Sequence, residues 1–387
     1  QFASSAASDV YKRQVKDKVL LVYDGEPKKK GISYVTSQEG NSEWSSNWRL
    51  RLKTAKKKGA KAIFIVSSNA DETLASESMK EYMMKENMTL GNAPAENEYC
   101  SNIYITEKMM EELVGADAAG EIKKMMKKTA KTGTPPNLTV KAKLGIHIDK
   151  VSEVIVSENV LGYVEGTDAK DEVIVLTAHY DHIGLHHDKI YNGADDNASG
   201  TVALMEIAEA LMLAKKDGIS PKSSILIMPV SAEEKGLLGS SYYSDNPIFP
   251  MEKTVANLNI DMIGRVDEDH KKNRDYIYII GSNFLSTELH AINETVASEY
   301  SELDLDYRFN SIDDPNRFYY RSDHYHFVKH NVPAIFYFNG THEDYHKHTD
   351  TYEKIQFDVL EKRTRLIFLT LWAVSYTHLT LPTMRTV

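Results

Sequence analysis

Residues 177–200, TAHYDHIGLHHDKIYNGADDNASG, concentrate side chains that bind metal ions. A zinc ion in a protein takes about four ligands, mostly imidazole nitrogens, thiolates and carboxylate oxygens. The stretch offers more candidates than one ion can use, so we expect a metal site to which only some of them contribute. The candidates are four histidines and four aspartates: His179, His182, His186, His187, Asp181, Asp188, Asp195 and Asp196.

Acidic residues also follow three apolar runs that we predict to be strands. In sheets of mostly parallel strands, ligand sites lie beyond the carboxyl ends of the strands. We therefore expect the residues after these runs to meet at one edge of a sheet. They are His179 and Asp181 after EVIVLTA, Glu233 and Glu234 after SSILIMPVSA, and Asp261 after TVANLNI.

The elements that must position these residues alternate between strands and helices. Such alternation predicts an α/β sheet with helices on both faces. Hydrophobic periodicity predicts strands over 173–178, 223–232, 254–260, 275–282 and 332–340, and helices over 199–216, 286–300 and 358–374.

Five motifs occur in an order that resembles the zinc peptidases of the M28 family, which includes bacterial leucyl-type aminopeptidases. The resemblance covers roughly residues 150–375. It implies a mixed, mostly parallel central sheet with helices on both faces, the fold of zinc exopeptidases. The motifs are AHYDHIG, NGADDNASG, SAEEKGLLGS, NIDMIG and DYHKHTDT.

The resemblance implies two zinc ions per chain. Zinc ions about 3.5–4 Å apart act as a catalytic pair, and a shared carboxylate can bridge them. Carried onto this sequence, His179 and Asp261 bind one ion, Glu234 and His346 bind the other, and Asp196 bridges both. The alternatives are His348 in place of His346, and Asp195 in place of Asp196.

Three further residues receive catalytic roles from the resemblance. Glu233 is the general base, which takes a proton from the water or hydroxide between the ions. Asp181 hydrogen-bonds His179 and fixes its tautomer, with direct metal ligation as the alternative. Tyr345 is a candidate donor to the oxyanion, and the alternative is a cleft tyrosine that only packs.

The remaining histidines and aspartates receive structural interpretations. We expect Asp195 to shape the turn before Asp196, and the other members of the opening stretch to lie on a loop near the cleft. Asp323, His324 and His326 are expected near the site without binding metal, and Cys100 is expected to be structural. The expected surface or loop residues are His270, His290, His330 and His342.

Residues 15–145 are expected to form a separate, smaller unit that precedes the catalytic domain at 146–375. The unit has strand, helix and strand patterns and a strand followed by a helix capped by Thr106. This order resembles the protease-associated (PA) domain, a β-rich α/β module.

The two ends of the chain are expected to be artefactual. Residues 1–14 and 376–387 resemble translated sequencing-adapter sequence, so we expect them to be artefactual tails. An N-terminal piece of the catalytic domain is expected to be missing.

The expected function is that of a dinuclear zinc aminopeptidase acting on peptides with a free N-terminus. A glutaminyl cyclase, which uses one zinc ion, or a carboxypeptidase could be built on the same scaffold. A non-catalytic binding protein is a further alternative, although all five ligand positions and the base are present. The sequence does not determine the preferred N-terminal side chain or the oligomeric state.

The charge and hydrophobicity of the chain indicate which classes of partner to expect. The net charge is −10, and the 25 basic and 19 acidic residues of 1–150 leave 21 and 37 for the remainder, so the halves carry +6 and −16. We interpret the lysine runs of the basic half as solvated helix faces and expect no nucleic acid. No apolar run reaches the roughly 18 residues of a membrane span, so we expect no stable membrane insertion. We expect a periplasmic or secreted bacterial location, although the single cysteine does not decide this.

Overall fold

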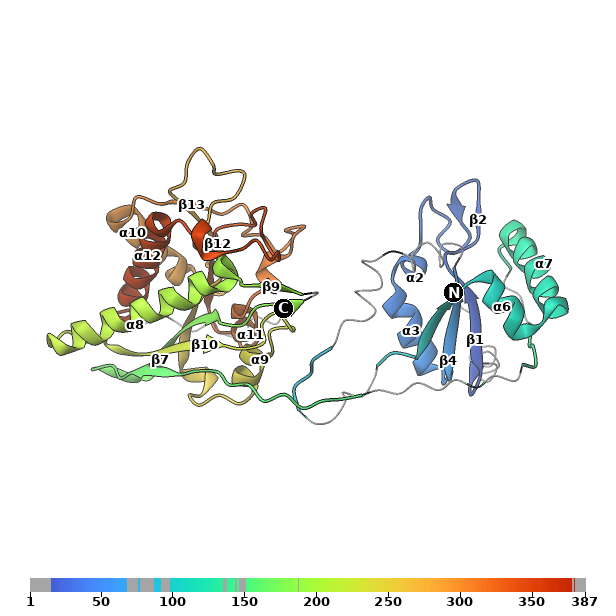
Figure 1. The fold of residues 1–387 in the computed structure, drawn as a ribbon, viewed down its shortest axis with the longest axis horizontal. Helices are drawn as coiled ribbons and strands as arrows, with labels where there is room; N and C mark the ends of the chain where they lie inside the picture. The colour runs from blue at the N-terminus through green and yellow to red at the C-terminus, as the bar shows by residue number, and fades with distance from the viewer. Residues whose placement is uncertain are drawn as a thin grey trace. The chain divides into compact units, whose positions relative to one another are not determined.

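The computed structural model of the chain divides into two compact units, residues 1–153 and 154–387 (Figure 1). The residues that it describes are 15–67, 76, 87–91, 98–134, 138–142, 145, 151–186, 188–377 and 379. Much of the two expected tails, together with His187, lies outside the described residues.

The second unit is built on a seven-stranded mixed sheet. The strand order is β13-β12-β14-β11-β7-β10-β6, in which the four strands from β14 to β10 are parallel to one another. Strand β12 runs antiparallel to β14, and β6 runs antiparallel to β10. The bounds are β6 (Gly162–Val164), β7 (Ala169–His179), β10 (Ser223–Val230), β11 (Thr254–Ile260), β12 (Tyr276–Ile280), β13 (Asp304–Asp306) and β14 (Ala334–Phe338).

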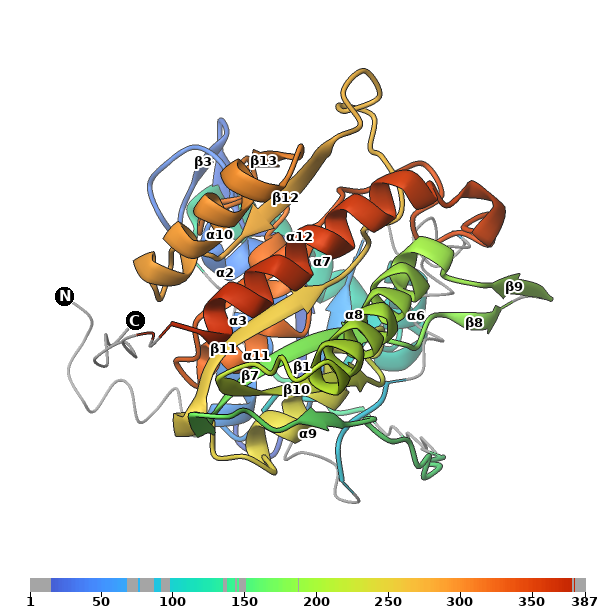
Figure 2. The same ribbon diagram turned by 90° about the vertical axis from the view of Figure 1, so that its left-hand side faces the viewer.

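Helices cover both faces of this sheet because its strands are apolar on both sides. Ile174 and Leu176 of β7 belong to a cluster with residues of α8, α10 and α12, whereas Val173 and Val175 belong to one with Tyr243 and Phe327 of α9 and α11. Helices α8, α10 and α12 therefore lie on one face of the sheet, and α9 and α11 on the other (Figure 2). Successive strand residues point to opposite faces, which explains this alternation. The helices are α8 (Gly200–Lys216), α9 (Leu238–Asp245), α10 (Thr287–Tyr300), α11 (His324–Lys329) and α12 (Phe357–Ser375).

Each strand and helix predicted for the second unit is present in the structure. Strand β11 has the predicted ends, and the other elements differ from the prediction by a few residues at one end or both. Ser286 caps α10 by accepting a hydrogen bond from the amide of Leu289 at 3.1 Å. The short elements were not predicted, because runs of three residues carry little periodicity. They include β6, β13 and the hairpin of β8 (Gly184–His186) and β9 (Lys189–Tyr191).

The first unit contains a three-stranded parallel sheet in the order β1-β4-β5. Leu52 of α3 packs with Ile63 and Ile65, and Met110 of α6 packs with Phe64 and Val66, so helices lie on both faces of the sheet. Helix residues outnumber strand residues in the described part of this unit. Its elements are β1 (Val19–Tyr23), β2 (Lys28–Lys29), β3 (Ile32–Ser33), α2 (Glu43–Ser46), α3 (Trp48–Lys57), β4 (Ala62–Val66), β5 (Asn102–Ile105), α6 (Glu107–Val114) and α7 (Ala116–Thr132).

Local signals account for the helix ends in this unit. Thr106 caps α6 by accepting a hydrogen bond from the amide of Met109 at 3.1 Å, as predicted. Gly133 ends α7 in the left-handed conformation at φ 70°, which glycine adopts without steric cost. Among the described residues of the chain, no helix is long and apolar enough to cross a membrane.

Candidate metal centre

The candidate metal ligands lie at the carboxyl ends of the central parallel strands. His179 is the last residue of β7, Asp261 directly follows β11, and Glu233 and Glu234 follow β10 by a few residues. Asp196 lies in the one-turn element η1 (Ala194–Ser199) that leads into α8. The parallel arrangement brings residues from distant parts of the chain to one edge, as the sequence predicted.

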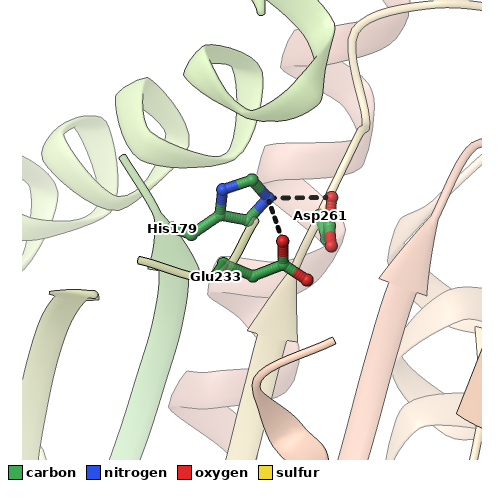
Figure 3. Close-up of side chains that lie close together, drawn as sticks. All are labelled: His179, Glu233 and Asp261. Atoms are coloured by element: carbon green, nitrogen blue, oxygen red, sulfur yellow. Dashed lines mark ion pairs between the residues drawn. The ribbon is translucent and has the colours of Figure 1, made fainter. Parts of the chain in front are cut away.

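The first group of ligands surrounds the Nε2 atom of His179. This atom lies 3.3 Å from Asp196 Oδ1, 3.5 Å from Asp261 Oδ1 and 4.0 Å from Glu233 Oε2. Figure 3 shows the imidazole facing Asp261 and Glu233. The His179 side chain is 1% exposed, so one ring nitrogen and three carboxylates converge at a buried point.

The second group surrounds the carboxylate of Glu234. Its Oε1 lies 2.7 Å from His182 Nδ1, and its Oε2 lies 3.6 Å from His346 Nε2. The same His346 nitrogen is 3.1 Å from Asp196 Oδ2. Because Asp196 directs Oδ1 to His179 and Oδ2 to His346, its carboxylate stands between the two groups.

A second carboxylate holds the turn that carries Asp196. Asp350, from the DYHKHTDT motif, accepts hydrogen bonds from the backbone amides of Asp195 at 3.0 Å and Asp196 at 3.2 Å. Asp350 is fully buried. This motif therefore contributes His346 to the site and also fixes the backbone of the opposite loop.

Asp181 contacts its expected partner in an unexpected way. His179 Nδ1 lies 3.0 Å from the backbone carbonyl oxygen of Asp181 and 3.8 Å from its carboxylate. The carboxylate instead accepts hydrogen bonds from the backbone amides of Glu233 at 3.1 Å and Glu234 at 3.3 Å. The main-chain oxygen of Asp181, not its carboxylate, therefore accepts the hydrogen bond from His179, and the carboxylate positions the two glutamates.

Unpaired buried atoms indicate that the two groups are suited to a cation. Within the described part of the chain, five of their buried atoms have no hydrogen-bond partner: Nε2 of His179, both ring nitrogens of His182, Oδ2 of Asp196 and Oε1 of Glu234. Buried polar groups are normally hydrogen-bonded, and unsatisfied ones often mark an ion. Nitrogen and carboxylate donors are the set that zinc prefers, so the residues fit zinc.

The charges of the site act against one another. Burial raises the pKa of Glu233 well above its usual range, and the nearby carboxylate of Asp261 raises it further, while His179 opposes the change. Burial alone would lower the pKa of His179, but Asp261 and Asp196 hold it well above its ordinary value. A bound divalent cation would offset this crowding of negative charge and allow the carboxylates to stay ionised.

A cleft of about 260 Å³ opens beside the two groups. Tyr345 stands in its wall, stacked on His346 with ring centroids 3.9 Å apart, and its hydroxyl oxygen accepts a hydrogen bond from Arg321 at 3.1 Å. The apolar part of the wall consists of Leu237, Met262, Phe318, Phe336 and Phe338.

Of the other histidines and aspartates considered in the sequence, most lie where they were expected, and His342 does not. His324 is buried, stacked on Phe336 at 4.9 Å, and His348 is exposed. Asp323 is buried behind the site, where burial raises the pKa of its carboxyl to about 7. His342 was expected at the surface, but it is buried with Nε2 3.1 Å from Asp195 Oδ2.

Sequence reasoning did not place His182 in the site. His182 was expected on a loop outside the ligand set, yet one of its ring nitrogens lies within 4.8 Å of ligand atoms of Asp196 and Glu234. Its position directly after the H-x-D aspartate was the available signal, but loop residues follow no period that reveals where they point. Ser322 was also overlooked, and its hydroxyl donates to Asp261 Oδ2 at 2.7 Å.

Curated relatives with peptidase names match parts of this chain. A probable zinc metalloprotease of Pyrenophora tritici-repentis is 28% identical over 252 residues, which cover 56% of this chain and 51% of that protein. Aminopeptidase YwaD of Bacillus subtilis is 34% identical over 110 residues, 28% of this chain and 22% of the relative. A probable glutamate carboxypeptidase, LAMP1, of Arabidopsis thaliana is 34% identical over 119 residues, 30% and 16% of the two chains. The chain thus spans about half of these relatives or less.

Among solved structures, BSAP, a zinc aminopeptidase from Bacillus subtilis, aligns with a TM-score of 0.48 and 18% identity, covering 92% of this chain and 74% of that one. The model of peptidase family M28 matches residues 159–371, more than half of the chain and the whole of the site described above. The chain therefore belongs to peptidase family M28.

Proposed function

We propose that the chain is a dinuclear zinc aminopeptidase that removes N-terminal residues from peptides. The observation that carries the proposal is the position of Asp196, whose two carboxylate oxygens face His179 at 3.3 Å and His346 at 3.1 Å. A carboxylate between two groups of nitrogen and oxygen donors is what a pair of zinc ions requires. His179 and Asp261 would hold one ion, Glu234 and His346 the other, and Asp196 both.

Glu233 is the residue best suited to move protons in this reaction. Zinc bound here would polarise the scissile carbonyl and make the attacking water more acidic. Glu233 lies in the cleft wall 4.0 Å from His179 Nε2, so its carboxylate can take the proton from that water. It then passes the proton to the departing amine, which leaves as the peptide bond breaks.

Tyr345 is placed to stabilise the oxyanion. Because its oxygen accepts the hydrogen bond from Arg321, its own proton is free to be donated into the cleft. Burial raises the pKa of this phenol above its usual value, and Asp196 raises it further, so the hydroxyl stays protonated. Hydrogen bonds of this kind strengthen as negative charge develops on the carbonyl oxygen.

The cleft favours a large apolar N-terminal side chain. The cleft has a volume of about 260 Å³, and much of its wall is apolar. Phe318, Phe336 and Phe338 provide an aromatic wall. We therefore expect leucine and phenylalanine substrates to be preferred to lysine and aspartate substrates.

The test combines metal content with a substrate panel. The full chain, loaded with zinc and freed of excess metal, should bind two ions and hydrolyse Leu-nitroanilide faster than the Ala-, Lys- and Asp-nitroanilides. Removal of zinc by a chelator should abolish the activity, and zinc should restore it. A zinc-loaded sample inert on every substrate with a free N-terminus would contradict the proposal.

A carboxypeptidase is the second candidate, because a positively charged arginine side chain lines the cleft. The Arg321 guanidinium that contacts Tyr345 is exposed and lines the same cavity. An arginine there could bind the carboxylate of a C-terminal residue. Peptides blocked at the N-terminus and free at the C-terminus distinguish the two activities, and glutaminyl peptides, together with a stoichiometry of one zinc ion, test for a cyclase.

The first unit is proposed to be a PA domain, on the order of its strands and helices. The sheet order β1-β4-β5 and the helix after β5 support this proposal.

We also propose a periplasmic or secreted location, which rests on the resemblance to bacterial aminopeptidases. Fractionation of cells that carry the gene would test the location, and activity confined to the cytoplasm would contradict it.

A further inference from the structure

We propose that His182 is a direct ligand of the zinc ion held by Glu234 and His346. This inference rests on the proposed two-zinc site and extends it, because His182 is not among the five ligands implied by the family resemblance. The two metal positions would then be unequal. One would have His182, Glu234, His346 and the shared Asp196, and the other His179, Asp261 and the shared Asp196.

The state of the His182 imidazole is the first argument. Its side chain is only 6% exposed, and neither ring nitrogen has a hydrogen-bond partner among the described residues. Burying an imidazole without partners costs free energy, and proteins seldom tolerate it. A metal ion at one ring nitrogen would remove much of this cost.

The contact with Glu234 is the second argument. His182 Nδ1 and Glu234 Oε1 lie 2.7 Å apart, yet neither atom has the alignment of a hydrogen bond to the other. The same Glu234 carboxylate faces His346 with its other oxygen, and the two imidazole centroids are 6.0 Å apart. Two imidazoles and a carboxylate that converge without hydrogen-bonding one another are arranged as donors around a cation.

Gly193 fixes the imidazole in this position. A Cβ atom on Gly193 would lie 2.5 Å from His182 Cγ and 2.8 Å from His182 Cβ, closer than real Cβ contacts. The glycine also has φ +63°, a conformation that other residues rarely adopt. The backbone of Gly193 therefore packs directly against the His182 ring. A larger residue at position 193 would push the ring out of place.

The unequal ligand sets assign different roles to the two positions. Four protein groups complete the tetrahedral set that zinc takes at closed sites, whereas three leave a coordination position open. We therefore expect the ion beside His182 to bind more tightly. The ion beside His179 would be the one with an open position for substrate, next to the proposed base Glu233.

Zinc titration of the metal-free full chain against a competing chelator tests the proposal without relying on activity. The unaltered protein should bind two ions with different affinities. His182→Ala should weaken the tighter one by more than the roughly 10–100-fold that follows loss of a residue acting through a ligand. The control His348→Ala, which removes an exposed histidine from the loop of His346, should leave both affinities unchanged.

If His182→Ala does not fold, a crystal structure of the unaltered, zinc-loaded protein tests whether His182 binds zinc. Anomalous scattering from zinc would locate the ions in that structure. A zinc peak about 2.0–2.1 Å from a ring nitrogen of His182 is expected. Two bound ions with both nitrogens beyond bonding distance, or unchanged affinities in His182→Ala, would reject the ligand role while leaving the two-zinc site intact. An unaltered chain that binds fewer than two ions would reject both proposals.

Discussion

Asp195 and Asp196 are neighbours in the sequence, but their carboxylates serve separate parts of the molecule. Asp195 accepts a hydrogen bond from the Gly264 amide at 2.6 Å and faces His342 Nε2 at 3.1 Å. Asp196 faces the imidazoles of His179 and His346 instead. One residue therefore holds the loop after β11, and the other is directed into the site.

Because the two aspartates have different partners, replacing each by asparagine should have a different effect. Asp196→Asn should lose at least one of two zinc ions after dialysis, because the amide is a poorer zinc ligand than the carboxylate. Asp195→Asn should retain both ions but reduce the free energy of unfolding by about 1–3 kcal/mol, since a buried charged hydrogen bond is lost. Metal analysis and urea unfolding measure the two effects. The reverse pattern would show that the bridging residue has been misassigned by one position.

Glu233→Gln should separate catalysis from metal binding. The variant keeps the size of the side chain but cannot accept the proton, so kcat should fall by about 10²–10⁴-fold. Zinc content should stay near two ions per chain, because Glu233 is not a proposed ligand. Glu343→Gln, at a side chain that is 67% exposed, is the matched control and should be fully active. Near-normal kcat in Glu233→Gln would exclude Glu233 as the base.

Tyr345→Phe should lower kcat with little change in KM. If the hydroxyl donates to the oxyanion only as it forms, its loss should cost about 10²–10³-fold in kcat. Tyr352→Phe is the control, because Tyr352 is 70% exposed and lies in the segment that follows the same motif. Unchanged kinetics in Tyr345→Phe would assign this ring a packing role alone.

His324 should make the stability of the protein sensitive to acid. Burial lowers the pKa of its imidazole to about 3, whereas an unfolded histidine titrates near 6.5. Between these values the unfolded chain binds a proton that the folded chain does not, so stability falls as the pH drops. The loss should reach about 2 kcal/mol between pH 6.5 and 5.

The comparison of His324→Phe with the unaltered chain isolates this contribution. The phenyl ring can keep the stacking on Phe336, so the variant should fold and lose less stability on acidification. Urea unfolding of the metal-free protein at both pH values measures the difference. His330→Asn, at an exposed histidine six residues away, should behave like the unaltered chain. Equal acid sensitivity in His324→Phe would mean that this imidazole is not buried neutral.

The amino-acid sequence by itself determined the α/β class and the edge at which the site forms. Long apolar runs such as 173–178 specify buried strands, and parallel strands place the residues that follow them at one edge. The cap at Thr106 was also predicted, because a cap depends on residues three positions apart. These features are local, and local patterns are visible in a sequence.

Only the tertiary structure decided which loop residues face the site. His182 approaches Glu234, His342 pairs with Asp195, and the Asp181 carboxylate binds the amides of the glutamates. Each contact joins segments more than 50 residues apart, through loops with no repeating period to indicate where a side chain points. The direction of such side chains depends on close packing between loops, as where His182 packs against the backbone of Gly193, and on charges that gather only when the sheet has formed.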